Sequence, residues 1–155
     1  MEAAYKARQA IYNSEKSGGS KDDELEETIS NITDNLVSHL LMKDETKLSG
    51  EVLSLSRDSN FIGNFKKRSK NDSEGRSLRD LELKNRIFKY PCSYMIYSKS
   101  FTALPEILRH SIFKQIRGVL SNKIKVGEYD YISDEKKLEL LEILGETIPF
   151  FSIRS

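Results

Sequence analysis

One run of the chain, Gly75 to Pro105, concentrates the side chains whose types could do chemistry. It interleaves aromatic rings with lysines and arginines and holds the only cysteine, Cys92. Rings stack on bases and cations contact phosphates, so such a mixture is found on surfaces that bind anions. A core element with a charged rim has the same composition, and helical spacing favours this second interpretation, a packed aromatic seam. The seam consists of Phe88, Tyr90, Tyr94, Tyr97 and Phe101.

The basic segment that leads into this run is the best candidate for an anion site. Gly75, Arg76 and Ser77 precede an expected helix, where backbone amides, a guanidinium and a hydroxyl would face a phosphate or carboxylate. The alternative is a solvated loop whose arginines pair with acidic neighbours such as Asp80 and Glu82. The candidate anion-binding residues are Lys66, Lys67, Arg68, Lys70, Arg76 and Arg79.

Catalytic and metal chemistry finds little support in the residue types. A nucleophilic Cys92 would need a base such as His39 or His110 nearby, and neither histidine has a recognisable signature around it. One cysteine excludes an internal disulfide and multi-cysteine zinc or iron–sulfur sites within one chain. The acidic run at residues 22–27 lacks the alternating ligands and glycine of a calcium loop. We therefore expect no catalytic residues, no metal and no cofactor.

Helices are the elements that must position these side chains. Apolar residues recur every three or four positions, which predicts helices over about residues 1–16, 22–42, 78–88, 105–123 and 134–144. Shorter apolar groups predict single turns at residues 52–55 and 61–65, and Pro91 suits the start of another short helix, CSYMIYSKS. Local signals add Ser20 and Ser133 as N-caps, Gly145 as a helix stop, and a tail from Pro149 that packs back onto the body.

These elements predict one all-α domain over residues 1–155, an irregular bundle of about five to seven helices with a long polar loop in the middle. Residues 17–20 are expected to form a flexible break and residues 66–76 an exposed basic loop. The sequence shows no pair of strands joined by a hairpin turn and no internal repeat.

The net charge of +1 hides a strong segregation. Residues 1–56 have a balance of −5, residues 57–125 of +10 and residues 126–155 of −4. The favoured interpretation is that the acidic ends pack on the basic middle, and the alternative is a basic face open to an anionic partner.

No apolar run is long enough to span a membrane and no signal peptide is evident, so the chain as written is expected to be soluble and cytoplasmic. If it is a fragment of a larger protein, an exported context remains open.

The block GRSLRDLELKNRIFKYPCSYMIYSKSFTALPEILRHSIFKQIRGVLS, together with EAAYKARQAIY, resembles the C-terminal helical region of large uncharacterised bacterial proteins. Some of those proteins are associated with exported or cytochrome-linked contexts. The resemblance covers most of the chain and implies a recurrent helical module, but it supplies no reaction and no residue roles.

The leading hypothesis is a non-enzymatic structural or protein-interaction module whose partner is another copy or another domain. A second hypothesis is a module that binds a polyanion, including nucleic acid, through the basic 66–79 segment. A third and weaker one is an enzyme with a site on residues 90–97, which would need Cys92, a tyrosine hydroxyl and a histidine around one pocket.

Overall fold

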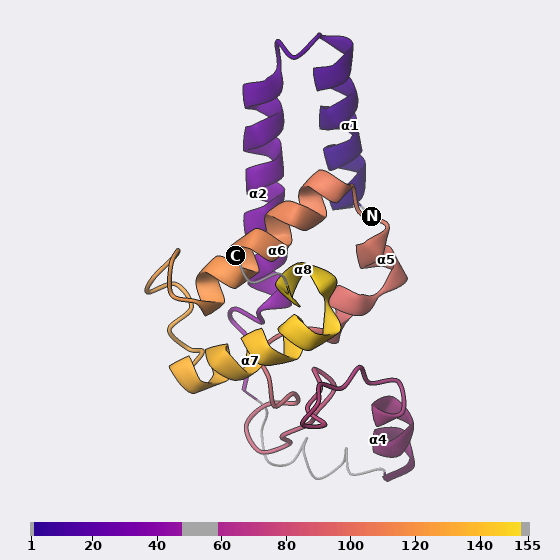
Figure 1. Cartoon of the computed structure of the whole chain (residues 1–155), viewed down its shortest axis with the longest axis vertical. Helices are drawn as coiled ribbons and strands as arrows, with labels where there is room; N and C mark the ends of the chain where they lie inside the picture. Colours follow the sequence, from indigo (N-terminus) through magenta and orange to yellow (C-terminus); the bar gives the residue numbers. More distant parts are fainter. Residues whose placement is uncertain (1, 48–58, 153–155) are drawn as a thin grey trace.

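The computed structural model describes residues 2–47 and 59–152, and this part of the chain contains helices, turns and irregular segments but no β-strand. The all-α class expected from the sequence is confirmed. Figure 1 shows α6 across α2 at the centre, α7 and α8 below that crossing, and α4 at the end opposite the α1–α2 hairpin. The elements are α1 (Glu2–Lys16), α2 (Asp22–Leu40), α4 (Ser59–Lys66), the 3-10 helix η1 (Tyr94–Tyr97), α5 (Lys99–Thr102), α6 (Glu106–Leu120), α7 (Asp134–Thr147) and α8 (Pro149–Ser152).

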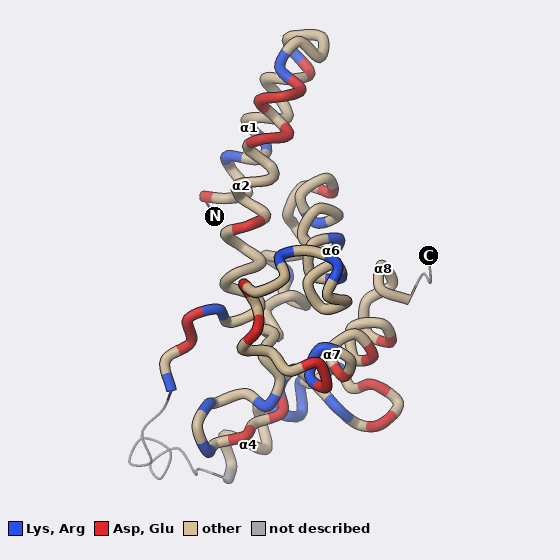
Figure 2. Tube along the Cα trace, turned by 90° about the vertical axis from the view of Figure 1, so that its left-hand side faces the viewer, with Lys and Arg blue, Asp and Glu red and all other residues tan. Residues whose placement is uncertain are grey.

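Helices α1 and α2 form an antiparallel hairpin whose outer end projects from the rest of the molecule (Figures 1 and 2). Both helices were expected within two residues of their observed ends. Ala7 and Ser14 are the buried residues of α1. On α2 the apolar side chains recur every three or four residues, so Ile29 and Val37 lie on the same, buried face. The hairpin therefore forms because each helix has one face suited to burial.

The turn between α1 and α2 is closed by local hydrogen bonds. Gly18 and Gly19 have φ of 65° and 85°, which glycine adopts without the steric cost of a Cβ. Ser14 Oγ donates to Asp22 Oδ1 at 2.6 Å and links the two helices across the turn. The expectation of Ser20 as N-cap is wrong, because its hydroxyl donates to the Ser17 carbonyl and α2 begins without a side-chain cap.

The core is centred where α2 crosses α6. Ile112 and Ile116 of α6 are fully buried, as is Val37 of α2. Burial of each such side chain contributes about 1.5–3 kcal/mol. At the same crossing the Thr33 hydroxyl donates to Ser111 Oγ at 2.9 Å, so a polar group in this contact keeps a hydrogen bond. The predicted helix after Pro105 is confirmed as α6.

Helix α7 begins as expected and ends later than expected. Ser133 is the N-cap, and its side chain accepts a hydrogen bond from the Lys136 amide at 3.3 Å. Gly145 does not stop the helix, which continues to Thr147. Ile148, with φ −127° and ψ 118°, ends it, because the proline ring that follows disfavours helical backbone at the preceding residue. Pro149 then begins the separate turn α8, which packs back onto α7 and α6.

The expected helix over residues 78–88 is absent. This segment folds as a hairpin-like turn in which the Glu82 amide donates to the Ile87 carbonyl at 3.0 Å, and Leu81 and Phe88 form an isolated antiparallel bridge. At its start, Asp80 Oδ2 accepts from the Ser77 amide at 3.1 Å. Such bonds from short side chains to the backbone compete with helix formation. The apolar residues of segment 78–88 fit the spacing of a helix, but in the structure they lie on an extended, hairpin-like turn.

The single short helix expected after Pro91 is also wrong in detail. Ser93 caps η1, and Ser98 then adopts extended backbone (φ −68°, ψ 154°) and caps α5. Two serine caps thus divide the segment into two short turns that point the aromatic residues in different directions. Helix α4 corresponds to the apolar turn expected at residues 61–65, whereas the turn expected at residues 52–55 lies outside the described residues.

The basic middle segment makes ion pairs with both acidic ends. Arg86 Nη2 lies 2.8 Å from Glu45 Oε2, and Lys125 Nζ lies 2.9 Å from Asp34 Oδ1. Arg76 Nη2 approaches Glu142 Oε2 of α7 at 2.7 Å. Figure 2 shows acidic and basic positions interspersed around α7 and along the segments near α4. The ends therefore neutralise part of the middle, as the favoured interpretation of the charge pattern expects.

Among the described residues, no helix is long and apolar enough to cross a bilayer.

Candidate functional site

The six candidate anion-binding residues do not share one environment. Lys66, at the end of α4, and Lys67 and Arg68, just after it, have exposed side chains. Lys70 is exposed but lies against an aromatic ring, whereas Arg76 and Arg79 contact the protein's own side chains. The segment of residues 66–79 therefore combines four exposed cations, one of them beside an aromatic ring, with two arginines that contact side chains of the fold.

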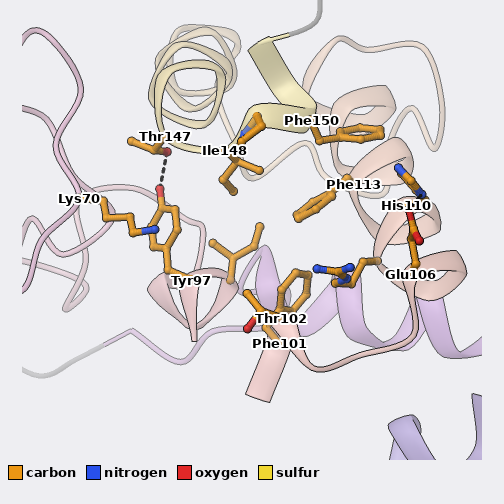
Figure 3. A pocket seen from close by; sticks show the side chains of 13 residues that line it. Lys70, Tyr97, Phe101, Thr102, Glu106, His110, Phe113, Thr147, Ile148 and Phe150 are labelled. Carbon is orange, nitrogen blue, oxygen red and sulfur yellow. Dashed lines mark hydrogen bonds and ion pairs between the residues drawn. The ribbon is translucent and has the colours of Figure 1, made fainter. Parts of the chain in front are cut away.

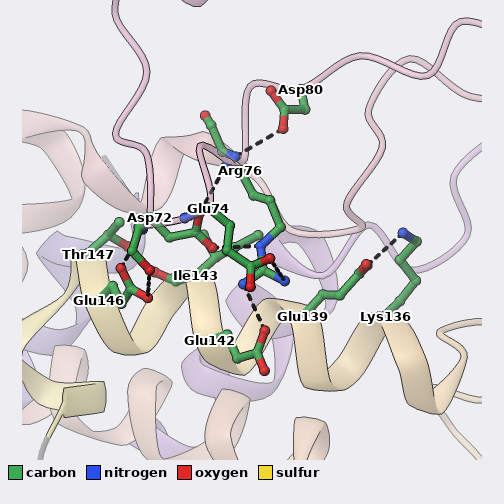
Figure 4. A network of polar contacts seen from close by, with 12 residues as sticks. Asp72, Glu74, Arg76, Asp80, Lys136, Glu139, Glu142, Ile143, Glu146 and Thr147 are labelled. Atoms are coloured by element: carbon green, nitrogen blue, oxygen red, sulfur yellow. Dashed lines mark hydrogen bonds and ion pairs between the residues drawn. The ribbon is translucent and has the colours of Figure 1, made fainter.

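Arg76 is the centre of a carboxylate network (Figure 4). Its Nε lies 2.7 Å from Asp72 Oδ2, its Nη2 2.7 Å from Glu142 Oε2 and its Nη1 3.4 Å from Glu74 Oε2. These neighbours raise the pKa of Arg76, the bond to Glu142 contributing most. Three carboxylates of the protein therefore contact the Arg76 guanidinium, which the sequence made a candidate for binding an external anion.

Asp72 is the buried partner in this network, with a side chain that is 0% exposed. Its Oδ1 accepts from the amides of Glu74 (3.0 Å) and Arg76 (2.8 Å). Burial alone would raise the pKa of Asp72, but the amide and guanidinium of Arg76, with the Glu74 amide, lower it overall. The next residue, Ser73, donates from its amide and hydroxyl to Glu146 of α7, at 2.6 and 2.7 Å. The loop is thus attached to α7 by hydrogen bonds.

Arg79 lies between two aromatic rings. Its Cζ is 4.5 Å from the ring centroid of Phe65 and 4.3 Å from that of Tyr94, and Nη1 donates to the Phe65 carbonyl at 3.3 Å. Phe88 extends this aromatic cluster, since its ring centroid lies 5.9 Å from that of Tyr94. This cation–π arrangement secures α4 to the irregular middle segment.

The aromatic seam proposed from the sequence is divided between three places. Tyr94 contacts Arg79 and has Phe88 beside it, and Tyr90 is fully buried elsewhere in the core. Tyr97 and Phe101 line a separate pocket, which also receives Lys70 from the basic segment. This pocket is where candidates from both sequence motifs meet.

The pocket is an open-sided cavity of about 300 Å³ lined by four parts of the fold (Figure 3). Helix α6 presents a stripe at helical spacing, Glu106, Arg109, His110 and Phe113, because positions three or four residues apart share one face. Figure 3 shows Phe113 and His110 facing Tyr97 and Lys70 across the cavity. The remaining wall comes from Ile96, Tyr97, Phe101 and Thr102 of η1 and α5, and from Thr147, Ile148, Pro149 and Phe150 at the junction of α7 and α8.

Aromatic packing maintains the apolar part of this cavity. The Phe113 ring centroid lies 5.5 Å from that of Phe101 and 5.3 Å from that of Phe150. Arg117 of α6 holds α8 in place, since its Cζ is 4.9 Å from the Phe150 centroid and its Nη2 donates to the Phe150 carbonyl. The wall formed by α8 is therefore fastened to α6.

The hydroxyl groups of the pocket donate to the protein itself. Thr147 Oγ1 donates to the Ile143 carbonyl at 2.6 Å and Thr102 Oγ1 to the Lys99 carbonyl at 3.1 Å. Tyr97 Oη lies 2.7 Å from Thr147 Oγ1. Because the single proton of Thr147 is already directed to Ile143, Tyr97 is the donor in this contact. Burial, before all other causes, raises the pKa of Tyr97 to about 12, so its phenol stays protonated at neutral pH.

Basic side chains also line the pocket. Arg109 Nε is buried and has no hydrogen-bond partner in the described part of the chain. Lys70 Nζ lies 5.0 Å from the Tyr97 ring centroid at the rim, with its side chain exposed. His110 Nδ1 is 3.9 Å from Glu106 Oε1, and both of these side chains are exposed. The pocket thus combines an apolar wall with positive groups and one carboxylate at its rim.

Sequence reasoning missed the groups from α6 and α8. Arg109 was not a candidate, His110 was considered only as a base for Cys92, and Phe150 was expected in a tail packed on the body. The available signal was the pair of basic residues Arg109 and His110, which follow the apolar position Leu108 and lie about one turn before Phe113. Local spacing cannot predict which distant segment packs against these two residues, because that depends on the tertiary fold.

Cys92 does not line this pocket and is fully buried. Burial raises the pKa of its thiol to about 12, so it is protonated at neutral pH. Within residues 2–47 and 59–152, no group of three or more histidine, cysteine, aspartate or glutamate side chains is arranged to hold a metal ion.

Comparison of the chain with models of protein families, with curated proteins and with solved structures gives no match in any of the three. The resemblance to the C-terminal region of large bacterial proteins therefore stays a prediction.

Proposed function

We propose that this domain is a non-catalytic binding module and that the pocket between η1, α6 and α8 is its binding site. The observation that carries the proposal is a cavity with an aromatic wall that Arg109 also lines, an arginine whose buried Nε has no hydrogen-bond partner in the described residues. A cavity with an apolar lining and a few convergent polar groups is the usual form of a small-molecule site. Its volume lies at the small end of the range for such sites.

Several features favour binding over catalysis. The tyrosine and threonine hydroxyls that line the pocket donate to protein acceptors, and the phenol of Tyr97 has a raised pKa. An activated nucleophile would instead need a neighbouring base and a lowered pKa. Cys92, the residue with the most nucleophilic side chain, does not line the pocket.

A titration of the ¹⁵N-labelled full chain with a library of small neutral, cationic and anionic compounds tests the proposal. We expect some members to shift amide resonances of η1, α6 and the α7–α8 junction together. The matched variants are Phe113→Ala, which enlarges the pocket, and Phe61→Ala, which removes an exposed ring of α4. Only the first should change the affinity. The proposal fails if no compound shifts these three segments, or if both variants alter binding equally.

The protein-interaction hypothesis is a second candidate, favoured by the projecting α1–α2 hairpin. Tyr5 and Tyr12, seven residues apart on one face of α1, are 66% and 60% exposed. We propose a second copy as the partner, because exposed tyrosines are common anchors of protein interfaces and the hairpin carries both basic and acidic residues. Sedimentation velocity over a concentration series should show an oligomer that Tyr5→Ser with Tyr12→Ser weakens. A monomer at every concentration would contradict this candidate.

Binding of a polyanion through residues 66–79 stays a prediction that the internal contacts of Arg76 and Arg79 do not favour. Lys66, Lys67 and Arg68 are the exposed cations that would carry it. A salt-sensitive interaction with single-stranded DNA that disappears in the triple glutamine variant would support it.

A further inference from the structure

We infer that the ligand of the pocket is a monocarboxylate attached to an aromatic body. This inference rests on the proposed binding function and names its ligand class. It follows from the hydrogen-bond donors that the pocket retains, from the charge at its rim and from the rings in its wall.

The retained donors select an acceptor with negative charge. Tyr97, Thr102 and Thr147 already direct their hydroxyl protons to Thr147, Lys99 and Ile143. The side chains left to donate to a ligand are then Arg109, Lys70 at the rim and the His110 ring, and the first two carry positive charge. An anion in the cavity that contacts the guanidinium of Arg109 gains a charge-assisted hydrogen bond.

The carboxylate at the rim selects a single negative charge. Glu106 lines the same cavity as Arg109 and its side chain is 77% exposed. A phosphate monoester carries close to two charges and three acceptor oxygens, so Glu106 repels it more strongly and one guanidinium leaves its oxygens underused. A carboxylate carries one charge and matches the planar guanidinium with both oxygens.

The rings in the wall select the body of the ligand. Phe101, Phe113 and Phe150 are neighbours at centroid distances of 5.3 to 5.5 Å, and all three line the cavity. Ile96 and Ile148 extend this surface and are 2% and 8% exposed. A flat ring that enters beside them gains apolar burial and offset or edge contacts with the phenylalanines.

The test compares 2-naphthoate with the neutral 2-naphthamide on the full chain by amide-shift titration. The two compounds share the ring system and differ in charge. We expect naphthoate to bind at least tenfold more tightly, with shifts in η1, α6 and the α7–α8 junction, because a hydrogen bond to a charged group is worth a factor of about ten or more. Octanoate, which has the charge without the ring, should bind more weakly than naphthoate.

Protein variants supply an independent comparison. Arg109→Gln should reduce naphthoate affinity about tenfold and leave naphthamide affinity unchanged, and Arg109→Lys should restore part of the loss. Lys114→Gln removes one positive charge from an exposed position of the same helix outside this pocket and should have little effect. The naphthoate–naphthamide comparison on the unchanged chain does not depend on the folding of any variant.

The outcomes separate this inference from the proposed function. Equal binding of naphthoate and naphthamide at the pocket, or binding of only neutral or cationic library members there, overturns the carboxylate assignment and leaves the binding module in place. Stronger binding of octanoate than of naphthoate overturns the aromatic body. If no compound of either set shifts the pocket segments, both the inference and the proposed function are wrong.

Discussion

Replacement of Asp72 by alanine should destabilise the fold strongly, because its carboxylate is fully buried and accepts three hydrogen bonds. Two come from backbone amides and one from Arg76 Nε, at 2.7 to 3.0 Å. Removal of one partner of a buried ion pair costs about 3–5 kcal/mol. Glu142 and Glu74 still neutralise Arg76 in the variant, so the lower end, about 3 kcal/mol, applies.

Thermal and urea denaturation followed by circular dichroism measure this loss. For a chain of this length, about 3 kcal/mol lowers Tm by roughly 6–12 °C. Glu74→Ala is the matched control, since it also removes a carboxylate next to Arg76 but from a side chain that is 68% exposed. It should cost less than about 1 kcal/mol.

The pH dependence checks the same network independently. The pKa of Asp72 is lowered in the folded state, so its stabilising contribution is complete above the ordinary aspartate pKa of about 3.9 and disappears as pH falls through the folded-state pKa. The difference in stability between the wild-type chain and Asp72→Ala should therefore be largest near neutral pH and shrink in acid. A difference that is the same at both ends, or equal losses in Asp72→Ala and Glu74→Ala, would refute the role assigned to this carboxylate.

Other side chains give three further expectations. Cys92 should resist a thiol reagent such as DTNB in the native state and react on unfolding in urea, since burial raises its pKa to about 12; rapid native labelling would contradict its position. Arg79→Ala should cost about 1–2 kcal/mol in urea unfolding through the loss of two cation–π contacts, whereas Arg68→Ala at an exposed position should be nearly neutral, and equal effects would show that the rings do not hold Arg79. Tyr97→Phe should lower stability by about 1 kcal/mol as the hydrogen bond to Thr147 is lost, and an unchanged Tm would argue against that bond.

The helices that the sequence predicted correctly have long apolar stripes and explicit terminal signals. In α6 the stripe Leu108, Ile112 and Ile116 follows Pro105, and in α7 the cap Ser133 precedes two acidic residues. Such helices depend on contacts between residues that are near in sequence, and these contacts are readable from spacing. The apolar residues of the short segment 78–88 are compatible both with a helix and with an extended, hairpin-like conformation. Hydrogen bonds from side chains to the backbone favour the second conformation, which the structure shows.

The candidate site was predictable only in part. Lys70, Tyr97 and Phe101 were recognised as residues of interest, but they were assigned to two different motifs. Their common neighbour is α6, and its residue Arg109 was not a candidate. The pocket joins residues 70 and 150, and no local pattern states which of two distant segments will face each other.

The sequence by itself determined the helical class, the principal helices and the charge segregation, because these depend on residue type and on spacing of three or four. Tertiary structure alone decided which charges are available. Packing of the middle segment on α7 placed Arg76 among three carboxylates, and the junction of α7 and α8 completed the wall of a pocket that Arg109 lines. Burial and partner choice are properties of the assembled fold, so Arg76 is held by carboxylates of the protein, whereas Arg109 Nε has no acceptor among the described residues.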